Sequence, residues 1–249
     1  LPALHMLKSG PRPSPKDVSC VILTPTRELA AQIADNIRTY GAGIKLHSQM
    51  VCGGVNIRPQ IRHLARGTDI LVATPGRLLD LLGQGAVRLG HVKMWVLDEA
   101  DRMLDMGFIP EMRRIHAELP KKRQTLMFSA TFSREIEALA GEFLHQPQKI
   151  QVTPANTTVS RIDQTVYPVD KARKTELLKH LVASERWGQV LVFSRTKYGA
   201  DKISRNLSKA GISSDSIHGD KKQGARTRSL KQFKDGRLQV LVATDIAAR

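Results

Sequence analysis

The sequence predicts an α/β fold in which two domains each pack helices against a parallel β-sheet. Short apolar runs alternate with amphipathic stretches along the chain, which is the βαβ pattern of such sheets. Several runs, such as Val190–Phe193, are apolar without alternation, as expected where both faces of a strand are buried. Near Thr153–Asp163 the apolar periodicity gives way to Pro, Asn, Thr and Ser. We therefore expect a first domain over 1–153, a linker over 154–163 and a second domain over 164–249.

The individual elements follow from this pattern in chain order. In the first domain the expected strands are Val18–Thr24, Leu46–Val51, Asp69–Ala73, Met94–Asp98 and Thr125–Phe128. In the second domain they are Thr165–Val169, Val190–Phe193, Ser213–Ile217 and Gln239–Ala243. Helical periodicity lies between the strands, most clearly over Arg27–Tyr40, Arg134–Leu144, Lys174–Ala183 and Gly199–Ala210.

The composition favours a polyanionic partner. The chain has 39 Lys and Arg against 23 Asp and Glu among 249 residues, a formal charge of +16. Such an excess favours nucleic acid, because neutralised phosphates release counterions, although a generally basic surface gives the same count. Cys20 and Cys52 stand apart without metal-ligand spacing, which indicates buried thiols, a reducing compartment and a cytoplasmic location. No apolar run is long enough to cross a membrane.

The strongest chemical signal is a hydrophobic strand that ends in carboxylates, the segment VLDEAD at 96–101. In such an arrangement the first carboxylate, Asp98, can hold Mg²⁺ through water, and Glu99 can act as a base for an attacking water. The alternative is an acidic helix start that is favoured by the helix dipole.

Other strand ends carry groups that bind oxyanions. Pro25-Thr26-Arg27, Gly53-Gly54 and the TPGR segment at 74–77 each follow an expected strand. Each offers free backbone amides, a hydroxyl or an arginine where phosphates can be held, although each alone also reads as an ordinary helix entry. Three such sites on one domain suggest a track for a phosphate backbone. Ser129-Ala130-Thr131 ends a further strand and can equally be a helix cap.

Five motifs of the first half, in this order, resemble those of the first RecA-like domain of DEAD-box RNA helicases: PTRELA (25–30), GG (53–54), TPGR (74–77), DEAD (98–101) and SAT (129–131). The second half continues the resemblance with VFSRT (192–196), HG (218–219), QGAR (223–226) and ATDIAAR (243–249). The resemblance covers essentially the whole chain. The wording of DMGF (105–108), HGDK (218–221) and QGARTR (223–228) is similar to the bacterial RhlE-like subgroup.

The resemblance implies two RecA-like domains that close on ATP, with Mg²⁺, and on single-stranded RNA, so that short duplexes are unwound or remodelled. It implies a role for Asp98 and Glu99 in Mg²⁺ binding and water activation, with Asp245 near the ribose of the nucleotide. Asp101, Ser129 and Thr131 would couple the nucleotide to domain closure. The implied RNA path is lined by Pro25, Thr26, Arg27, Gly53, Gly54, Thr74, Gly76, Arg77, Arg195, Gly219, Gln223, Arg226 and Thr244. Recognition would be largely independent of base sequence.

Whole segments of the family's pattern are absent. Nothing matches G-x-x-x-x-G-K-[ST], the loop that holds the nucleotide phosphates, and the arginine-rich segment that supplies the arginine finger does not occur. Leu1–Leu7 reads as the end of a helix, so we expect both domains to be truncated. An arginine finger is worth roughly 10³–10⁵ in rate, so we expect an ineffective ATPase. An open sheet edge would also make the chain a poor folder.

Two other functions remain open. One is an RNA-binding or protein-interaction module that lacks ATPase activity. The other is a DNA helicase of the wider superfamily, which the DEAD, SAT and PTRELA wording disfavours by family analogy. Ribosome-assembly or RNA-decay proteins are conceivable partners, and the motifs do not say which RNA is bound.

Overall fold

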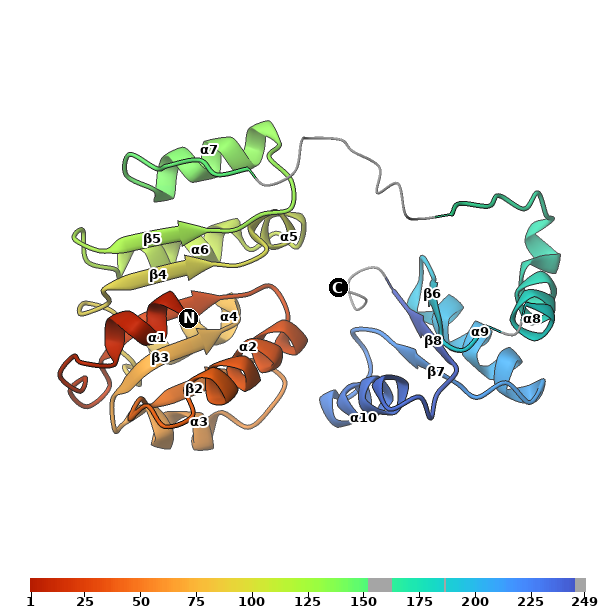
Figure 1. The fold of residues 1–249 in the computed structure, drawn as a ribbon, viewed down its shortest axis with the longest axis horizontal. Helices are drawn as coiled ribbons and strands as arrows, with labels where there is room; N and C mark the ends of the chain where they lie inside the picture. Colours follow the sequence, from red (N-terminus) through yellow and green to blue (C-terminus); the bar gives the residue numbers. More distant parts are fainter. Residues whose placement is uncertain (152–162, 186, 245–249) are drawn as a thin grey trace. The chain divides into compact units, whose positions relative to one another are not determined.

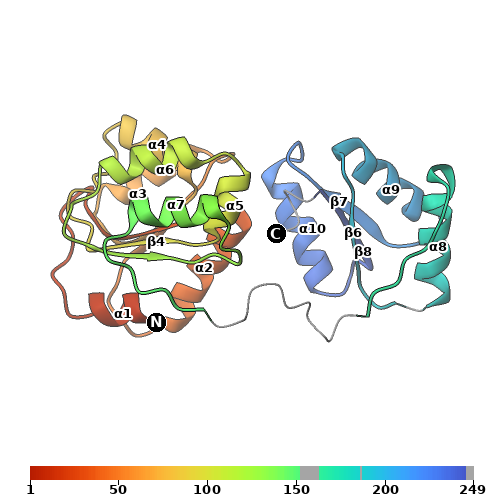
Figure 2. The same ribbon diagram turned by 90° about the horizontal axis from the view of Figure 1, so that it is seen from above.

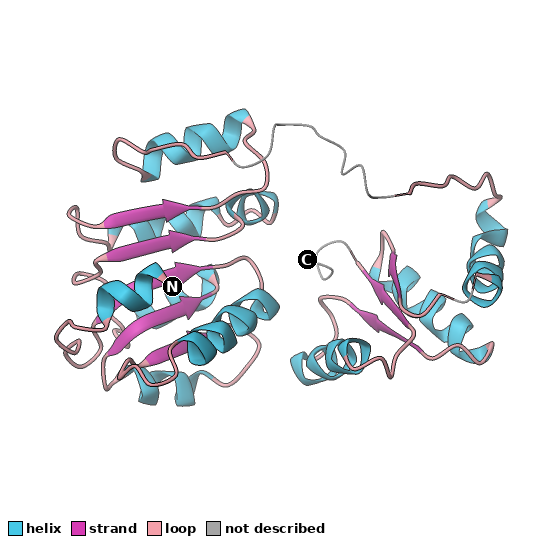
Figure 3. Cartoon of the chain, in the orientation of Figure 1, coloured by secondary structure: helices cyan, strands magenta, loops and turns pink. Residues whose placement is uncertain are grey.

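The computed structural model describes residues 1–151, 163–185 and 187–244. The chain divides into two compact units, Leu1–Ala155 and Asn156–Arg249 (Figure 1). Each unit is a parallel β-sheet with helices against it, as the alternation of apolar runs predicts (Figures 2 and 3).

The sheet of the first unit is parallel throughout. Its strand order is β2 (Ser48–Val51), β3 (Thr68–Ala73), β1 (Val18–Leu23), β4 (Met94–Leu97) and β5 (Gln124–Met127). β1, β3 and β4 are almost wholly buried, which explains why their sequences are apolar without alternation. β5 forms one edge of the sheet and is only half-buried, and the adjoining Phe128 is 53% exposed.

The helices of the first unit cover both faces of its sheet. They are α1 (Pro2–Leu7), α2 (Arg27–Tyr40), α3 (Ile57–Leu64), α4 (Pro75–Gly83), α5 (Ala100–Asp105), α6 (Ile109–Ala117) and α7 (Arg134–Phe143). Side chains of α3 to α7 pack in one apolar cluster with alternate residues of β1, β3 and β4. The intervening residues of these strands pack with α1 and α2 in a second cluster. Alternation along the strand thus assigns each side chain to one of two cores.

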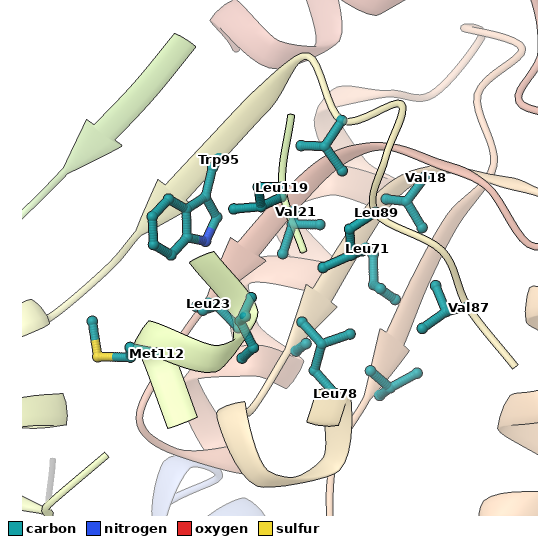
Figure 4. Close-up of a cluster of buried hydrophobic side chains, with 14 of the residues drawn as sticks. Val18, Val21, Leu23, Leu71, Leu78, Val87, Leu89, Trp95, Met112 and Leu119 are labelled. Carbon is teal, nitrogen blue, oxygen red and sulfur yellow. The ribbon is translucent and has the colours of Figure 1, made fainter. Parts of the chain in front are cut away.

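Trp95 of β4 is the largest fully buried side chain of the first core (Figure 4). Its ring stacks on His116 at 5.5 Å between centroids and meets Phe143 edge-on at 5.2 Å. Val21 and Leu71 lie in the same cluster, on the two strands beside each other in the sheet. These contacts join β4 to α6 and α7, and so hold the segments that follow β4 and β5.

The second unit is smaller, with strand order β6 (Val190–Phe193), β8 (Val240–Ala243) and β7 (Ser214–Ile217), all parallel. Its helices are α8 (Lys174–Ser184), preceded by the 3-10 turn η1 (Lys171–Arg173), α9 (Lys197–Lys209) and α10 (Gln223–Lys234). In the central β8, Val240 and Val242 pack with α8 and α9, whereas Leu241 and Ala243 pack with α10.

One predicted strand is wrong. Residues 165–169 form no strand, and Val166 is 90% exposed. Pro168 lacks the amide that a sheet ladder needs, and no described strand pairs with this segment. The other predicted strands form with ends that differ by no more than two residues, and the helix over Arg27–Tyr40 has the predicted bounds. The predicted linker lies almost wholly outside the described residues, so its bounds stay a prediction.

Both cysteines are free and buried, as their apolar surroundings indicate. Burial raises the pKa of Cys20 to about 12, so its thiol is kept protonated. Among the described helices, none combines the length and the apolar character that crossing a membrane requires.

Candidate functional site

The five strands of the first sheet end at one level. Leu23 of β1 is the register partner of both Ala73 and Leu97, and these two pair in turn with Val51 and Met127. Because the sheet is parallel, the segments that follow the strands all leave the same edge, toward which the arrowheads in Figure 1 point. The predicted residues of the first domain, from Pro25 to Thr131, belong to these segments. The parallel sheet thus gathers them along one edge.

The first of these segments joins β1 to α2. The Thr26 hydroxyl accepts a hydrogen bond from the Leu29 amide at 3.3 Å and caps α2. The Thr24 hydroxyl donates to the Thr26 carbonyl at 3.1 Å. Both threonines and Pro25 are buried. The turn is therefore rigid, and the start of α2 is held against the sheet with Arg27 in its first turn.

Arg27 packs on Gly53-Gly54, the pair that follows β2. Gly54 has φ of +72°, and a Cβ built on it would overlap the Arg27 guanidinium. A Cβ on Gly53 would lie 3.7 Å from Nη2, which is an ordinary contact. The left-handed backbone thus favours glycine at position 54, and the lack of a Cβ leaves room for the guanidinium to lie against it.

Arg77 braces the same loop from the other side. Its Nη2 donates to the Val55 carbonyl at 3.1 Å, and the side chain is only 10% exposed. Its Nη1 is buried with no partner among the described residues. Thr74 makes no side-chain capping bond at the start of α4, and Gly76 is exposed with open space around it. In this segment the exposed backbone of Gly76 is therefore better placed to meet a ligand than the Arg77 guanidinium.

Asp98 and Glu99 occupy the junction between β4 and α5. The Asp98 amide donates to the Leu23 carbonyl at 2.9 Å, and its Oδ1 accepts from the Glu99 amide at 3.1 Å. Glu99 has φ of +53° and ψ of +55°, a left-handed conformation that costs a non-glycine residue about 1–3 kcal/mol. The Ala100 amide donates to the Phe128 carbonyl at 2.9 Å and ties this junction to β5. The surrounding hydrogen bonds thus hold a strained carboxylate junction in place.

Burial raises the pKa of Asp98 above its ordinary value, although the Glu99 amide partly opposes this shift. A nearby cation would stabilise the ionised form. The described residues contain no group of three or more ligands that could cage a metal ion alone. Mg²⁺ commonly takes one or two carboxylates and completes its shell with water and phosphate oxygens. Asp98 therefore fits as the single protein ligand of a magnesium ion carried by a nucleotide.

Asp101 joins the carboxylate junction to the segment after β5. Its Oδ2 accepts from both the amide and the hydroxyl of Thr131, at 3.1 and 3.0 Å. The Ser129 hydroxyl donates to the Thr131 carbonyl at 2.7 Å. The three residues predicted as a group are thus directly connected, and hydrogen bonds tie the start of α5 to 129–131.

The second sheet repeats this arrangement at its own carboxyl edge. Phe193 and Ile217 are both register partners of Ala243, so the three strands end at one level. The residues that follow them include the exposed Arg195 and Gly219, the half-buried Gln223 and Arg226 of the first turn of α10, and the buried Thr244. Asp245 lies outside the described residues, so its predicted place near the ribose stays a prediction.

Three segments that follow strands share a hydrogen-bond pattern that the sequence analysis did not predict. In three places a hydroxyl residue donates to the carbonyl of a threonine two positions later: Thr24 to Thr26, Ser129 to Thr131, and Ser194 to Thr196. Thr26 and Thr196 then cap the following helix. The pattern of a hydroxyl residue, any residue and a threonine within two residues of the end of a strand is the signal that could have revealed it.

A cavity of about 230 Å³ lies at the opposite, amino edge of the first sheet. Its walls come from the segments before β1, β2 and β3 and from the start of β3, and consist of Arg12, Pro13, His47, Arg66, Gly67 and Asp69. None of the predicted site residues belongs to it.

Two parallel sheets covered by helices, the first with a carboxylate junction at its carboxyl edge, define a class, the RecA-like α/β domains. The chain belongs to the DEAD/DEAH box helicase family, whose model matches residues 1–139. The model of the helicase conserved C-terminal domain matches residues 173–249. The two matches fall on the two compact units.

Curated relatives from different kingdoms are similar over most of the chain. The ATP-dependent RNA helicase DBP2 of Gibberella zeae is 41% identical over 100% of the chain and 46% of its own length. The ATP-dependent RNA helicase RhlB of Pseudomonas aeruginosa is 44% identical over 92% of the chain and 58% of its own length. The chain therefore spans about half the length of these relatives.

Solved structures confirm the RecA-like fold. Dbp5 of S. cerevisiae, bound to RNA and ADP BeF3, superposes with a TM-score of 0.85 at 29% identity, over 99% of this chain and 62% of Dbp5. A DEAD box protein of the hyperthermophile Methanococcus jannaschii gives a TM-score of 0.53 at 36% identity, over 92% of this chain and 61% of that protein.

The raised pKa of Asp98 predicts how this residue affects stability. Because the folded pKa exceeds the ordinary value of 3.8, the stability from the protonated group is complete below pH 3.8 and is lost as pH rises through the folded pKa. Asp98→Asn cannot ionise, so we expect it to raise the melting temperature by a few degrees at neutral pH. The gain should shrink as the pH approaches 3.8.

Thermal melts followed by circular dichroism across this pH range measure the difference. Asp35→Asn, at an exposed position beside Arg38, is the matched control and should show no such gain. A lower melting temperature for Asp98→Asn at neutral pH would mean that the folded protein favours the carboxylate.

Proposed function

We propose that the protein is an ATP-dependent RNA helicase, which unwinds or remodels short RNA duplexes as its two domains close on ATP and single-stranded RNA. The observation that carries this proposal is the hydrogen-bonded connection from the carboxylate junction through Asp101 to Thr131, on the edge that also holds the phosphate-binding turns. The names of the relatives, which are ATP-dependent RNA helicases, support it.

RNA would be held by its sugar-phosphate backbone. The first domain offers the Arg27 guanidinium over Gly53-Gly54 and the exposed Gly76, and the second offers Arg195, Gly219 and the first turn of α10. Amides and arginines of this kind read phosphates and sugars rather than bases, so binding would be largely independent of sequence. The other residues predicted for the path, Pro25, Thr26, Thr74, Arg77 and Thr244, are largely buried and would shape it.

The nucleotide would meet the carboxylate junction. Asp98 would hold Mg²⁺ through water, and this ion supplies charge neutralisation for the phosphates when it is bound. Glu99, which joins β4 to α5, would orient and deprotonate the attacking water. Asp101, Ser129 and Thr131 would pass the state of the nucleotide to the segment after β5. Asp245 would approach the ribose.

Three finer points belong to this proposal. The RhlE-like wording of the motifs motivates a place in that bacterial subgroup, yet DBP2 at 41% and RhlB at 44% identity do not separate the subgroups. Buried thiols and the basic charge support a reducing, cytoplasmic setting. Proteins of ribosome assembly or RNA decay would be its partners.

An RNA-binding module without ATPase activity is the second candidate. The observation in its favour is the excess of basic residues, 39 Lys and Arg against 23 Asp and Glu, which suits a polyanionic ligand without any nucleotide chemistry.

RNA-stimulated ATP hydrolysis separates the two candidates. We would compare the chain with a chimaera that adds the phosphate-loop and arginine-rich segments of a relative, each beside its Glu99→Gln variant. Turnover by the chimaera alone, lowered by at least about 100-fold in Glu99→Gln, is the expected result. RNA binding by a chimaera that never hydrolyses ATP would instead favour the binding module.

The contact between Arg27 and Gly54 predicts a selective loss of RNA affinity. An alanine at Gly54 would displace the guanidinium, so we expect Gly54→Ala to bind single-stranded RNA about 5–10-fold more weakly, as when an arginine no longer reaches one phosphate. Gly43→Ala is the matched control, because Gly43 has φ of +84° with nothing within 4 Å of a built Cβ.

Alanine in a left-handed conformation costs about 1–2 kcal/mol of stability at either position, so the melting temperatures of the two variants should fall by similar amounts. Fluorescence anisotropy with a labelled oligonucleotide measures the affinity. Equal RNA affinities for the two variants would mean that Arg27 does not contact the backbone.

A further inference from the structure

The loop over 218–222 in the second domain joins β7 to α10 and is held by two carboxylates that no proposed role yet uses. Asp215 of β7 accepts from the Lys221 ammonium at 2.5 Å and from the Ser229 hydroxyl of α10. Asp201 of α9 accepts from the Ser216 hydroxyl at 2.5 Å and pairs with His218 Nε2 at 3.0 Å. Asp215 of β7 is thus one of the two carboxylates, and its neighbour Ser216 donates to the other.

These contacts fix the loop from both sides. His218 is 4% exposed, and its pair with Asp201 ties the start of the loop to α9. Lys197 at the start of α9 pairs with Asp220 at 2.6 Å. Lys221, at the end of the loop, is tied to β7. Gly219, which lies between these anchors, is itself exposed with open space around it.

The Asp215 cluster also orients α10. Ser229 is fully buried, and it stands two turns into the helix whose first turn carries Gln223 and Arg226. Burial alone would raise the pKa of Asp215, but the hydrogen bonds from Lys221 and Ser229 outweigh it and hold that pKa below its ordinary value. The Ser216 hydroxyl likewise lowers the pKa of Asp201 in spite of burial. Both groups are therefore carboxylates at neutral pH and full hydrogen-bond acceptors.

We propose that Asp215 and Asp201 are positioning residues for RNA, which hold the loop over 218–222 and the start of α10 so that Gly219, Gln223 and Arg226 meet the sugar-phosphate backbone together. The inference rests on the proposed function, since it assigns the supports of the same RNA path. Neither carboxylate would contact RNA, because each is occupied by protein donors.

The direction in which RNA affinity changes distinguishes a positioning role of the two carboxylates from a simple effect of their charge. Asp215→Asn and Asp201→Asn each remove a negative charge, and for a polyanionic ligand simple electrostatics then predicts tighter binding. Positioning predicts the reverse. In Asp215→Asn one of the two oxygens that accept from Lys221 and Ser229 becomes an amide nitrogen, which cannot accept. In Asp201→Asn the bonds from Ser216 and His218 to Oδ1 lose their charge assistance. Asp235→Asn is the control with the same charge change in the same domain, at an exposed residue that pairs with Arg237 outside this network.

The experiment measures single-stranded RNA affinity of the full chain by anisotropy over a range of salt, together with melting temperature. We expect Asp215→Asn and Asp201→Asn to bind about 10-fold more weakly and Asp235→Asn to bind equally or slightly more tightly. The slope of log affinity against log salt concentration should also become shallower by about 0.7 for each phosphate that the variant no longer neutralises, which a merely structural role would not change. Lys221→Arg, which keeps the cation, should retain most of the affinity.

Affinities for Asp215→Asn and Asp201→Asn that match or exceed Asp235→Asn would overturn the inference. If Asp215→Asn does not fold, Ser229→Ala keeps the charge and carries the test, with a weakening of about 3-fold expected and an unchanged affinity as the contrary result. Absence of RNA binding by the unmodified chain would reject the proposed function as well. Normal binding by the unmodified chain with no effect of the substitutions would reject this inference alone.

Discussion

The parallel ladder around β1 is the constraint on which the rest of the structure depends. β1 pairs with β3 on one side and β4 on the other, so Leu23 is level with both Ala73 and Leu97. The register of β1 against its neighbours is fixed, because a shift of one residue would turn the side chains of β1 from one core to the other. The turns that follow these strands therefore start side by side, and the register of the sheet fixes where each loop at this edge begins.

Hydrogen bonds within the segments that follow the strands then fix the conformation of the aligned turns. The hydroxyl bonds of Thr24 and Ser194 stiffen the first turn after β1 and β6, and Thr26 and Thr196 cap the helices that follow. Glu99 is held in a left-handed conformation by neighbours on both β1 and β5, which offsets its local cost. Both domains thus use the same hydroxyl-stabilised turn after a strand, whereas the carboxylate junction after β4 depends on a strained backbone.

Periodicity in the sequence was sufficient for the strands that pack on both faces and for α2, whose amphipathic pattern and Thr26 cap are local signals. It failed at residues 165–169, because an apolar alternation has no meaning without a neighbouring strand to pair with. The alignment of the motifs at one edge followed from the parallel pattern. The inward placement of Arg77 could not be predicted from the sequence pattern, since its bond to the Val55 carbonyl depends on a loop that is 22 residues away in sequence. The carboxylates behind 218–222 were missed for the same reason.

Hydrogen exchange of backbone amides with and without single-stranded RNA tests most directly whether the carboxyl edges of both sheets are the working surface. The account predicts that RNA protects the segments 24–27, 52–55 and 74–77 in the first unit and 218–226 in the second. The amino edge, including 12–13, 45–47 and 66–67 around the basic cavity, should exchange as before. Protection that is concentrated on the amino edge, with the carboxyl-edge turns unchanged, would contradict the account.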